Sequence, residues 1–148
     1  MSVRREWSIP SVLVLALVTT ASCAGAGQST AVCAPVAPVV SPQRVAPGGE
    51  RHIEVAGLTT GGDCESRLPE GARYELGLRW AGEAPPVSLG VLQLGFDGVV
   101  QGTVRVPEDG PAGTAELSVN LEGAPTVCET DPTIGCAKDP FTLVDIAR

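Results

Sequence analysis

Cysteines are the residues of this chain whose number and spacing most clearly imply chemistry. Four of the five, Cys33, Cys64, Cys128 and Cys136, lie beyond the N-terminal region. In a protein outside the reducing cytoplasm, an even number of cysteines predicts disulfides, here two. A zinc site is the competing use. The sequence has no CxxC pair and only one histidine, His52, which argues against both zinc and a redox centre.

Spacing favours a local pairing of these four cysteines. If Pro47-Gly48-Gly49 turns the chain between two antiparallel strands, residues equally distant from Gly48 lie opposite each other, which brings Cys33 level with position 63, beside Cys64. Cys128 and Cys136 flank the loop ETDPTIG. Cys33–Cys64 with Cys128–Cys136 is therefore the expected pairing, and the crossed pairings, which would tie the two loops together, remain the alternatives.

Motifs for catalysis are missing from the sequence. A catalytic serine on a sharp turn would need a pattern such as GxSxG, and none occurs. No glycine-rich loop follows a strand into a helix to cradle a phosphate. Strand alternation places His52 beside Glu54 on a polar face, where a solvated histidine is expected. We therefore predict no catalytic residue, no metal, no cofactor and no enzymatic activity.

Acidic side chains gather in two loops. The loop at residues 59–73 and the segment around ETDPTIG together hold Asp63, Glu65, Glu129, Asp131 and Asp139. We predict that these are binding loops, because function concentrates in loops held by a rigid scaffold. The alternatives are a solvated acidic rim or a calcium site, which takes 6–8 oxygen ligands, although the calcium-loop pattern D-x-[DN]-x-[DN]-G does not occur.

The first residues read as an export signal. Arg4 and Arg5 precede the apolar run SVLVLALV and the tetrapeptide TASC, which ends at Cys23. This arrangement resembles a bacterial lipoprotein signal, which implies cleavage before Cys23 and attachment of lipid to it; Thr20 departs from the aliphatic residue usual there. The alternative is ordinary cleavage after Ala26 in the AGA site, which would release a soluble protein.

This signal divides the chain into three parts and sets its charge. We expect a signal helix and peptide at residues 1–22, a flexible tether at residues 23–32 and one domain at residues 33–148. From Cys23 onward the chain carries 8 basic and 16 acidic residues, a formal charge of −8. This charge disfavours nucleic acid and anionic lipid as partners, so we expect contact with the membrane through the anchor alone, and a monomer.

Alternating apolar residues predict that the domain is all-β. Ile53 and Val55 share one face of a strand while His52 and Glu54 share the other. VSLGVLQL alternates poorly, and we expect it to switch between sheets. The other predicted inward-facing positions are Tyr74, Leu76, Leu78, Trp80, Val100, Val104, Val106, Ala115, Leu117, Val119 and Leu121.

Several motifs resemble the immunoglobulin-like domains of bacterial surface and secreted proteins. They are APGGE, the run FDGVVQGTVRVPEDGPAGTAELSV and the terminal PFTLV, within residues 38–147. The resemblance implies an antiparallel sandwich of about seven strands with both cysteine loops at one end. The high ratio of arginine to lysine is typical of a GC-rich genome, and an actinobacterial source is expected.

The resulting expectation is a lipid-anchored binding module on the extracytoplasmic face of the cell membrane. Its partner would be a protein or cell-wall ligand that the residues do not identify. Two other classes compete with this one: an accessory structural subunit of an envelope complex, and a secreted enzyme inhibitor that inserts a disulfide-held loop.

Overall fold

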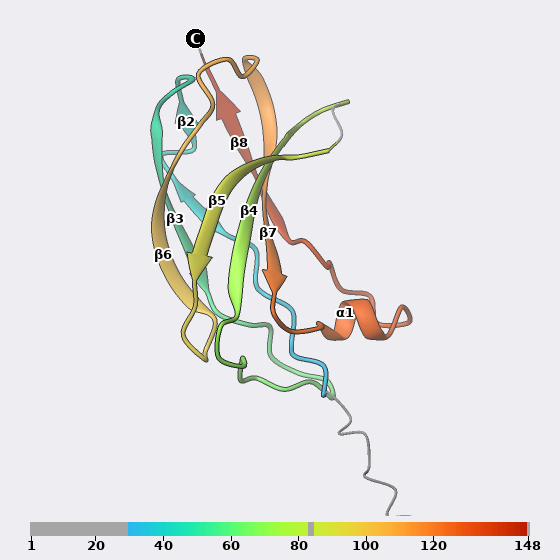
Figure 1. The fold of residues 1–148 in the computed structure, drawn as a ribbon. Helices are drawn as coiled ribbons and strands as arrows, with labels where there is room; N and C mark the ends of the chain where they lie inside the picture. Colours follow the sequence, from blue (N-terminus) through green and yellow to red (C-terminus); the bar gives the residue numbers. More distant parts are fainter. Residues whose placement is uncertain (1–29, 83–84, 148) are drawn as a thin grey trace, which may run out of the picture.

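The computed structural model describes residues 30–82 and 85–147, which form two β-sheets around one apolar core (Figure 1). Over these described residues the fold is all-β apart from one four-residue helix, as the alternation predicted. The expected signal peptide, Cys23 and most of the tether lie outside the described residues. Within them, no helix is long and apolar enough to cross a membrane.

Eight strands form the two sheets. The first sheet has the order β1-β3-β6 and the second the order β2-β8-β7-β4-β5. All neighbours are antiparallel except β2 and β8. The elements are β1 (Val39–Ser41), β2 (Arg44–Val45), β3 (Glu50–Ala56), β4 (Arg73–Trp80), β5 (Val87–Gln93), β6 (Val99–Arg105), β7 (Gly113–Glu122), α1 (Val127–Thr130) and β8 (Phe141–Ile146).

The strand that changes sheets is the N-terminal one. β1 pairs with β3 in the first sheet and, two residues later, β2 pairs with β8 in the second. The prediction that VSLGVLQL switches is wrong, because β5 lies wholly beside β4. Its register shifts where Leu76 faces Gly90 and Gly77 faces Ser88. Leu89 is the extra residue of this bulge, so the inward-facing positions before and after it do not follow a single period of two. This explains why neither the odd-numbered nor the even-numbered residues of VSLGVLQL are consistently polar.

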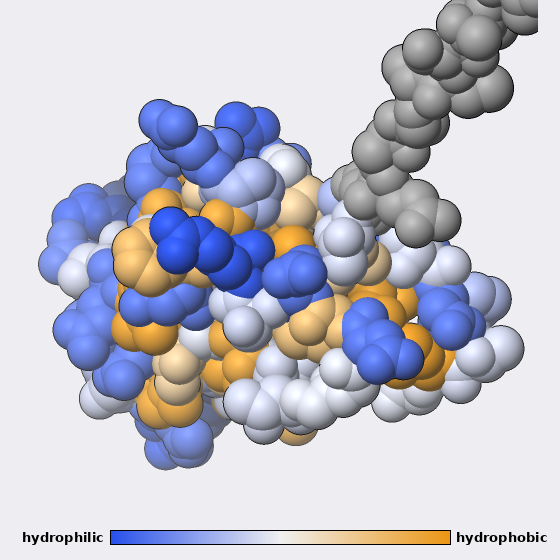
Figure 2. Space-filling view, turned by 90° about the horizontal axis from the view of Figure 1, so that it is seen from below, coloured by the Kyte–Doolittle hydropathy of each residue, from blue (hydrophilic) through white to orange (hydrophobic). Residues whose placement is uncertain are grey.

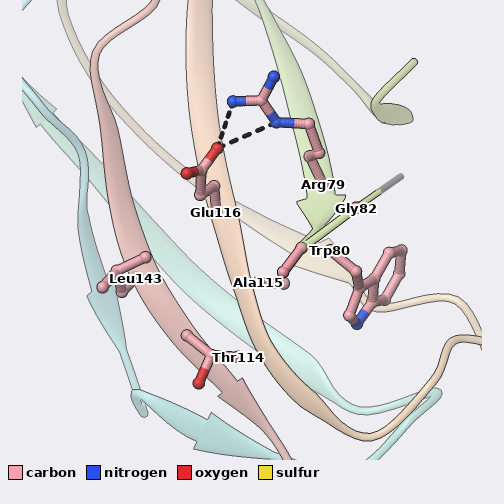
Figure 3. Close-up of a pocket in the computed structure, with 8 residues that line it drawn as sticks. Arg79, Trp80, Gly82, Thr114, Ala115, Glu116 and Leu143 are labelled. Atoms are coloured by element: carbon pink, nitrogen blue, oxygen red, sulfur yellow. Dashed lines mark hydrogen bonds and ion pairs between the residues drawn. The ribbon is translucent and has the colours of Figure 1, made fainter. Parts of the chain in front are cut away.

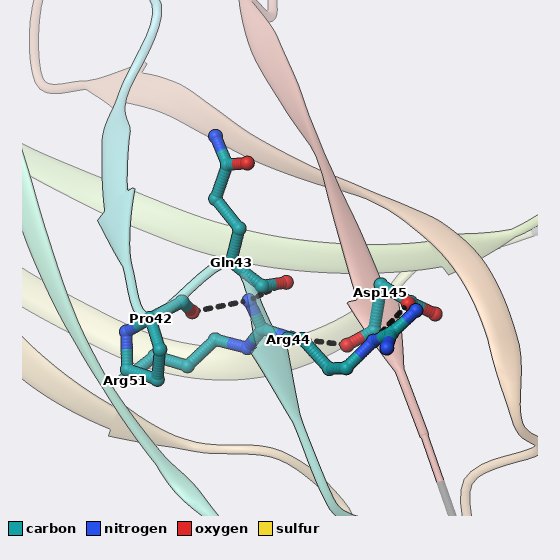
Figure 4. Close-up of polar contacts among 5 residues, drawn as sticks. All are labelled: Pro42, Gln43, Arg44, Arg51 and Asp145. Carbon is teal, nitrogen blue, oxygen red and sulfur yellow. Dashed lines mark hydrogen bonds and ion pairs between the residues drawn. The ribbon is translucent and has the colours of Figure 1, made fainter.

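A buried arginine holds the strand switch. Arg51, at the start of β3, is 0% exposed. Its Nη1 donates to the carbonyl oxygens of Pro42 at 2.8 Å and Gln43 at 2.7 Å, and its Nη2 donates to the carbonyl oxygen of Asp145 at 2.7 Å (Figure 4). Burial lowers the pKa of Arg51 and the charge of Asp145 partly offsets this. The guanidinium thereby ties the β1–β2 connection to β8.

The core follows the predicted alternation. Ile53 and Val55 of β3 are fully buried, whereas His52, which precedes Ile53, is exposed. Side chains from both sheets form one apolar cluster, in which every predicted inward residue is buried except Val100, which is half-buried. The fully buried Tyr74 supplies the single phenol, whose hydroxyl donates to the carbonyl oxygen of Gly98 at 3.0 Å.

Tyr74 should make stability fall at high pH. Burial, and then the charge of Asp97, raise its pKa from 10.0 to about 12. In the unfolded chain the phenol loses its proton near pH 10. The stabilisation that the protonated phenol gives the folded state is therefore complete below pH 10 and is lost as the pH rises towards about 12. Tyr74→Phe should weaken this dependence and cost about 0.5–1.5 kcal/mol at neutral pH. Phenolate absorbance tests this directly, because the chain has one tyrosine; a native midpoint near 10 would contradict it.

Candidate functional site

The structure pairs Cys33 with Cys64 and Cys128 with Cys136, as expected. Their Cα atoms lie 4.9 and 5.5 Å apart. The register used to reach the first pair is wrong, however. Val39 faces Glu54 rather than position 57, so a count continued along this ladder would miss Cys64. The chain between the end of β3 and Cys64 leaves the ladder in a loop that contains Gly61 and Gly62, and this loop brings Cys64 beside Cys33.

Both disulfides lie at the same end of the two sheets, as predicted. Val32 forms parallel bridges with Glu65 on one side and Thr126 on the other. The amide of Cys33 donates to the carbonyl oxygen of Glu65 at 2.9 Å, and that of Val127 to the carbonyl oxygen of Val32 at 2.8 Å. We call the surface formed by residues 31–33, 59–72 and 125–138 the disulfide end; viewed from below, it carries both hydrophilic and hydrophobic side chains (Figure 2).

Two of the acidic residues predicted to bind a partner, Glu129 and Asp131, instead accept hydrogen bonds from residues of their own loop. Glu129 Oε2 accepts hydrogen bonds from the amide of Thr126 at 2.8 Å and from its hydroxyl at 3.0 Å, while Oε1 lies 3.1 Å from Lys138 Nζ. The Thr126 amide is the main cause of the lowered pKa of Glu129. Asp131 Oδ1 accepts from the hydroxyl of Thr133 at 2.6 Å and from its amide at 2.9 Å. Both carboxylates stabilise the loop's conformation.

The other three acids are divided between two surfaces. Asp63 and Glu65 are exposed at the disulfide end. Asp139 instead lines hollows on the outer face of the second sheet with Ser118 and Asn120. Across residues 30–82 and 85–147, no three His, Cys, Asp or Glu side chains are grouped to hold a metal ion, so the calcium alternative has no ligand set there.

Three neighbouring hollows form a groove that the sequence did not reveal. Hollows of about 130 and 140 Å³ share Pro86, Ser118 and Asp139, and the second shares Arg79 and Glu116 with a third of about 340 Å³. They follow the outer face of β7. We call this surface the outer groove and define it by Glu75, Arg79, Glu116, Ser118, Asn120 and Asp139.

Strand register explains how the outer groove is assembled. On β7, Asn120 faces Glu75 of β4 and Glu116 faces Arg79, whose Nε lies 3.0 Å from Glu116 Oε2 (Figure 3). On the other side, the exposed residues Phe141 and Leu143 of β8 face Ser118 and Glu116. The groove thus has a polar floor beside an apolar wall.

The residue in the middle of the groove floor is Gly77, where a side chain would fill part of the groove. Gly77 faces Ser118, and a Cβ atom at this position would lie 3.1 Å from Ser118 Oγ and 3.3 Å from Pro86 Cβ. Glycine inside a strand costs about 0.5–1 kcal/mol relative to alanine. Its presence here is explained by the close approach of Pro86, which narrows the groove above the floor.

The outer groove carries excess negative charge. Arg79 and Glu116 neutralise each other, whereas Glu75 and Asp139 form no ion pair within the described part of the chain. The groove was invisible in the sequence because its residues come from strands and loops far apart along the chain. The alternation indicated only that Glu75, Glu116, Ser118 and Asn120 would face outward.

Comparisons with known proteins place the chain in no family. No protein-family model and no curated protein matches it. Among solved structures, a superoxide reductase (neelaredoxin) from Ignicoccus hospitalis is similar to 76% of this chain and 80% of its own, with 13% identity and a TM-score of 0.39. A likeness of this size carries no argument about fold or activity.

Proposed function

We propose that this protein is a lipid-anchored, extracytoplasmic binding module with an immunoglobulin-like fold and no catalytic activity. The observation that carries the proposal is the outer groove, a preformed recognition surface on the flank of a disulfide-stapled domain. Binding sites combine a few placed polar groups with apolar walls, and the outer groove has both.

Strand order supports the immunoglobulin-like assignment. In such sandwiches, strands A, B and E share one sheet, and strands C, F and G share the other, to which some members add C′. Here β1, β3 and β6 correspond to A, B and E. The second sheet, β8-β7-β4-β5, corresponds to G, F, C and C′, and β2 continues the first strand beside β8.

The anchor point favours the outer groove over the disulfide end as the binding surface. Thr30 leads directly into Val32, which lies between the two loops of the disulfide end. Thr30 lies seven positions after Cys23, and seven residues reach about 25 Å at most when fully extended. A lipid on Cys23 would therefore hold the disulfide end towards the membrane and leave the flank free. The disulfide end, with Asp63 and Glu65, is the second candidate surface.

Cys23→Ala should move the protein from the membrane fraction into the medium, because the lipid is its only proposed attachment. Cell fractionation followed by immunoblotting measures the distribution, and mass spectrometry of the unaltered protein should find an acylated N-terminal cysteine. A free N-terminus at Gly27 would show ordinary cleavage after Ala26 and overturn the anchor.

Capture from solubilised membranes separates the two rival functions. A stoichiometric membrane protein that stays bound when the outer groove is altered would favour the accessory subunit. A secreted hydrolase whose activity falls on binding would favour the inhibitor, for which the loop closed by Cys128–Cys136 is the natural inserting element. Loss of the captured ligand on groove substitution supports the binding module.

A further inference from the structure

We propose that the outer groove binds a neutral oligosaccharide. This inference rests on the proposed function only in taking the outer groove as the binding surface, and it assigns that surface a ligand class. Four properties of the groove carry it: its charge, its place within the sheet, the hydrogen-bonding character of its floor and its shape.

Charge argues against an anionic ligand. Arg79 is already paired with Glu116, so a phosphate or carboxylate entering the groove would meet no free cation among the groove residues. It would instead meet the carboxylates of Glu75 and Asp139. The negative charge of the whole domain adds to this repulsion. Nucleic acids and acidic cell-wall polymers are thereby disfavoured.

The place of the groove within the sheet argues against an extended peptide. Peptides that add to sheets bind through the unpaired backbone of an edge strand. The floor of the groove is β7 and β4, and each has a hydrogen-bonded neighbour on both sides. The pairing covers most of the floor: β7 pairs with β4 over residues 115–122 and with β8 over residues 113–118, and β4 pairs with β5 over residues 73–78. Most backbone groups are therefore used in the ladders, and recognition of a ligand there falls mainly to side chains.

The groove side chains match the chemistry of sugar hydroxyls, which both donate and accept hydrogen bonds. Ser118 and Asn120 can donate and accept, whereas the carboxylates of Glu75 and Asp139 only accept when ionised. Asn120 and Glu75 lie opposite each other across the strands. One ring carrying adjacent hydroxyls can bind both. A neutral polyhydroxylated ligand thus satisfies the mixed floor without burying a charge of its own.

The shape of the groove fits a short chain of rings. From Asn120 to Thr114, β7 extends about 20 Å at 3.3 Å per residue. The three hollows line this path, and their combined size falls within the range of about 300–1,000 Å³ usual for ligand sites. Along the wall, Phe141 and Leu143 are 46% and 57% exposed, which offers apolar contact to the C–H faces of sugar rings.

Calorimetric titration of the mature protein in detergent tests the inference. The probes are three neutral tetrasaccharides, built from N-acetylglucosamine, mannose or galactose, an acidic tetramer of galacturonate and a tetralysine peptide. We expect at least one neutral tetrasaccharide to bind saturably, and both charged probes to bind more weakly. If no neutral tetrasaccharide binds, or if a charged probe binds more tightly than all three, the proposal is overturned.

Variants locate the site. Asn120→Ala and Asp139→Ala should each weaken binding about tenfold, the scale of a lost hydrogen bond to a ligand. Gly77→Val, which fills the floor, should abolish binding. Thr103→Val, an exposed position on β6 of the other sheet, is the matched control and should change nothing. Thermal unfolding of each variant separates the loss of the site from the loss of the fold. Asp139 lies outside the strands, so Asp139→Ala leaves the strand residues unchanged.

One outcome would move the site elsewhere. If Asp63→Ala or Glu65→Ala weakens sugar binding while Asn120→Ala and Asp139→Ala do not, the ligand binds the disulfide end and the groove assignment is wrong. Cell fractionation of Cys23→Ala tests the anchor separately from all of these titrations. Failure of the anchored-module proposal and failure of the ligand assignment are therefore distinguishable.

Discussion

Replacing both Cys33 and Cys64 with alanine should lower the free energy of unfolding by about 3–4 kcal/mol, because this bridge closes the longer loop. The two cysteines are separated by 31 positions, whereas Cys128 and Cys136 are separated by 8. A disulfide lowers the conformational entropy of the unfolded chain, and this stabilising effect grows with the logarithm of the length of the loop that it closes. On the same relation, the double alanine variant of the second pair should cost about 2–3 kcal/mol.

Urea denaturation followed by tryptophan fluorescence measures both losses. A protein that begins at Cys23, as the proposed signal cleavage would produce, contains Trp80 as its only tryptophan. Trp80 is buried in the core, so its emission reports on the whole domain. A larger loss for the Cys128–Cys136 variant would contradict the predicted order. It would show that α1 and its loop contribute more to the folded state than loop length implies.

The first bridge also supports the arrangement of the disulfide end. Cys33 is buried and its amide is bonded to Glu65, so the strand-like segment around Val32 is held from both neighbouring loops. The protein has little aromatic surface to compensate, because its described core contains only Tyr74 and Trp80 as buried rings. A loss of 3–4 kcal/mol is a large share of the roughly 5–15 kcal/mol typical of a domain.

The parts of the fold that sequence could predict are those governed by a local period. In β4, Tyr74, Leu76 and Leu78 alternate with Glu75 and Arg79, and the structure buries the first set while the second faces outward. A half-buried strand needs only this alternation. The presence of strands and their inward faces therefore follow from the residues themselves.

Register and irregularity could not be predicted in the same way. The shift beside Gly77 depends on how β5 meets β4. Gly90, a glycine inside the strand with a φ of 122°, marks the place of the bulge, but it does not tell which residue of VSLGVLQL is extra. The outer groove depends in turn on the strand order β8-β7-β4. Asp139 was assigned to the disulfide end by its place in the chain, but the path into β8 carries it over the sheet face.

One missed feature did have a local signal. Thr126 and Glu129 have the spacing of a capping box, in which the side chain of the fourth residue bonds back to the first amide. The structure forms this box at the start of α1. The pattern would have shown that Glu129 stabilises a helix start rather than being free to bind a ligand.

Arg51 shows where alternation conflicts with residue chemistry. It shares the parity of Ile53 and Val55, so the period places it inside, although arginine is almost never fully buried unless it is paired. The conflict is resolved by three backbone carbonyls that only the tertiary structure brings together. Its Nε has no partner among the residues the structure describes, so these three bonds carry the whole interaction.

Arg51→Met should lower the free energy of unfolding by about 3 kcal/mol. Methionine keeps much of the apolar stem but leaves three carbonyl oxygens without their donor. A hydrogen bond to a charged group contributes about 1.5–3 kcal/mol, and the relief of burying a charge offsets part of the total. Arg51→Lys should recover only part of the loss, because a single ammonium cannot reproduce the fork that reaches both Gln43 and Asp145.

Arg44 provides the matched control, because it contacts the same Asp145 from outside. Its Nε lies 2.6 Å from Asp145 Oδ2, and its side chain is 76% exposed. Exposed ion pairs contribute about 0–1 kcal/mol, so Arg44→Ala should be nearly neutral in the same urea titration. If Arg51→Met proved equally neutral, the strand switch would be held by the β2–β8 pairing and packing alone. The predicted difference therefore tests whether one buried guanidinium joins the two sheets.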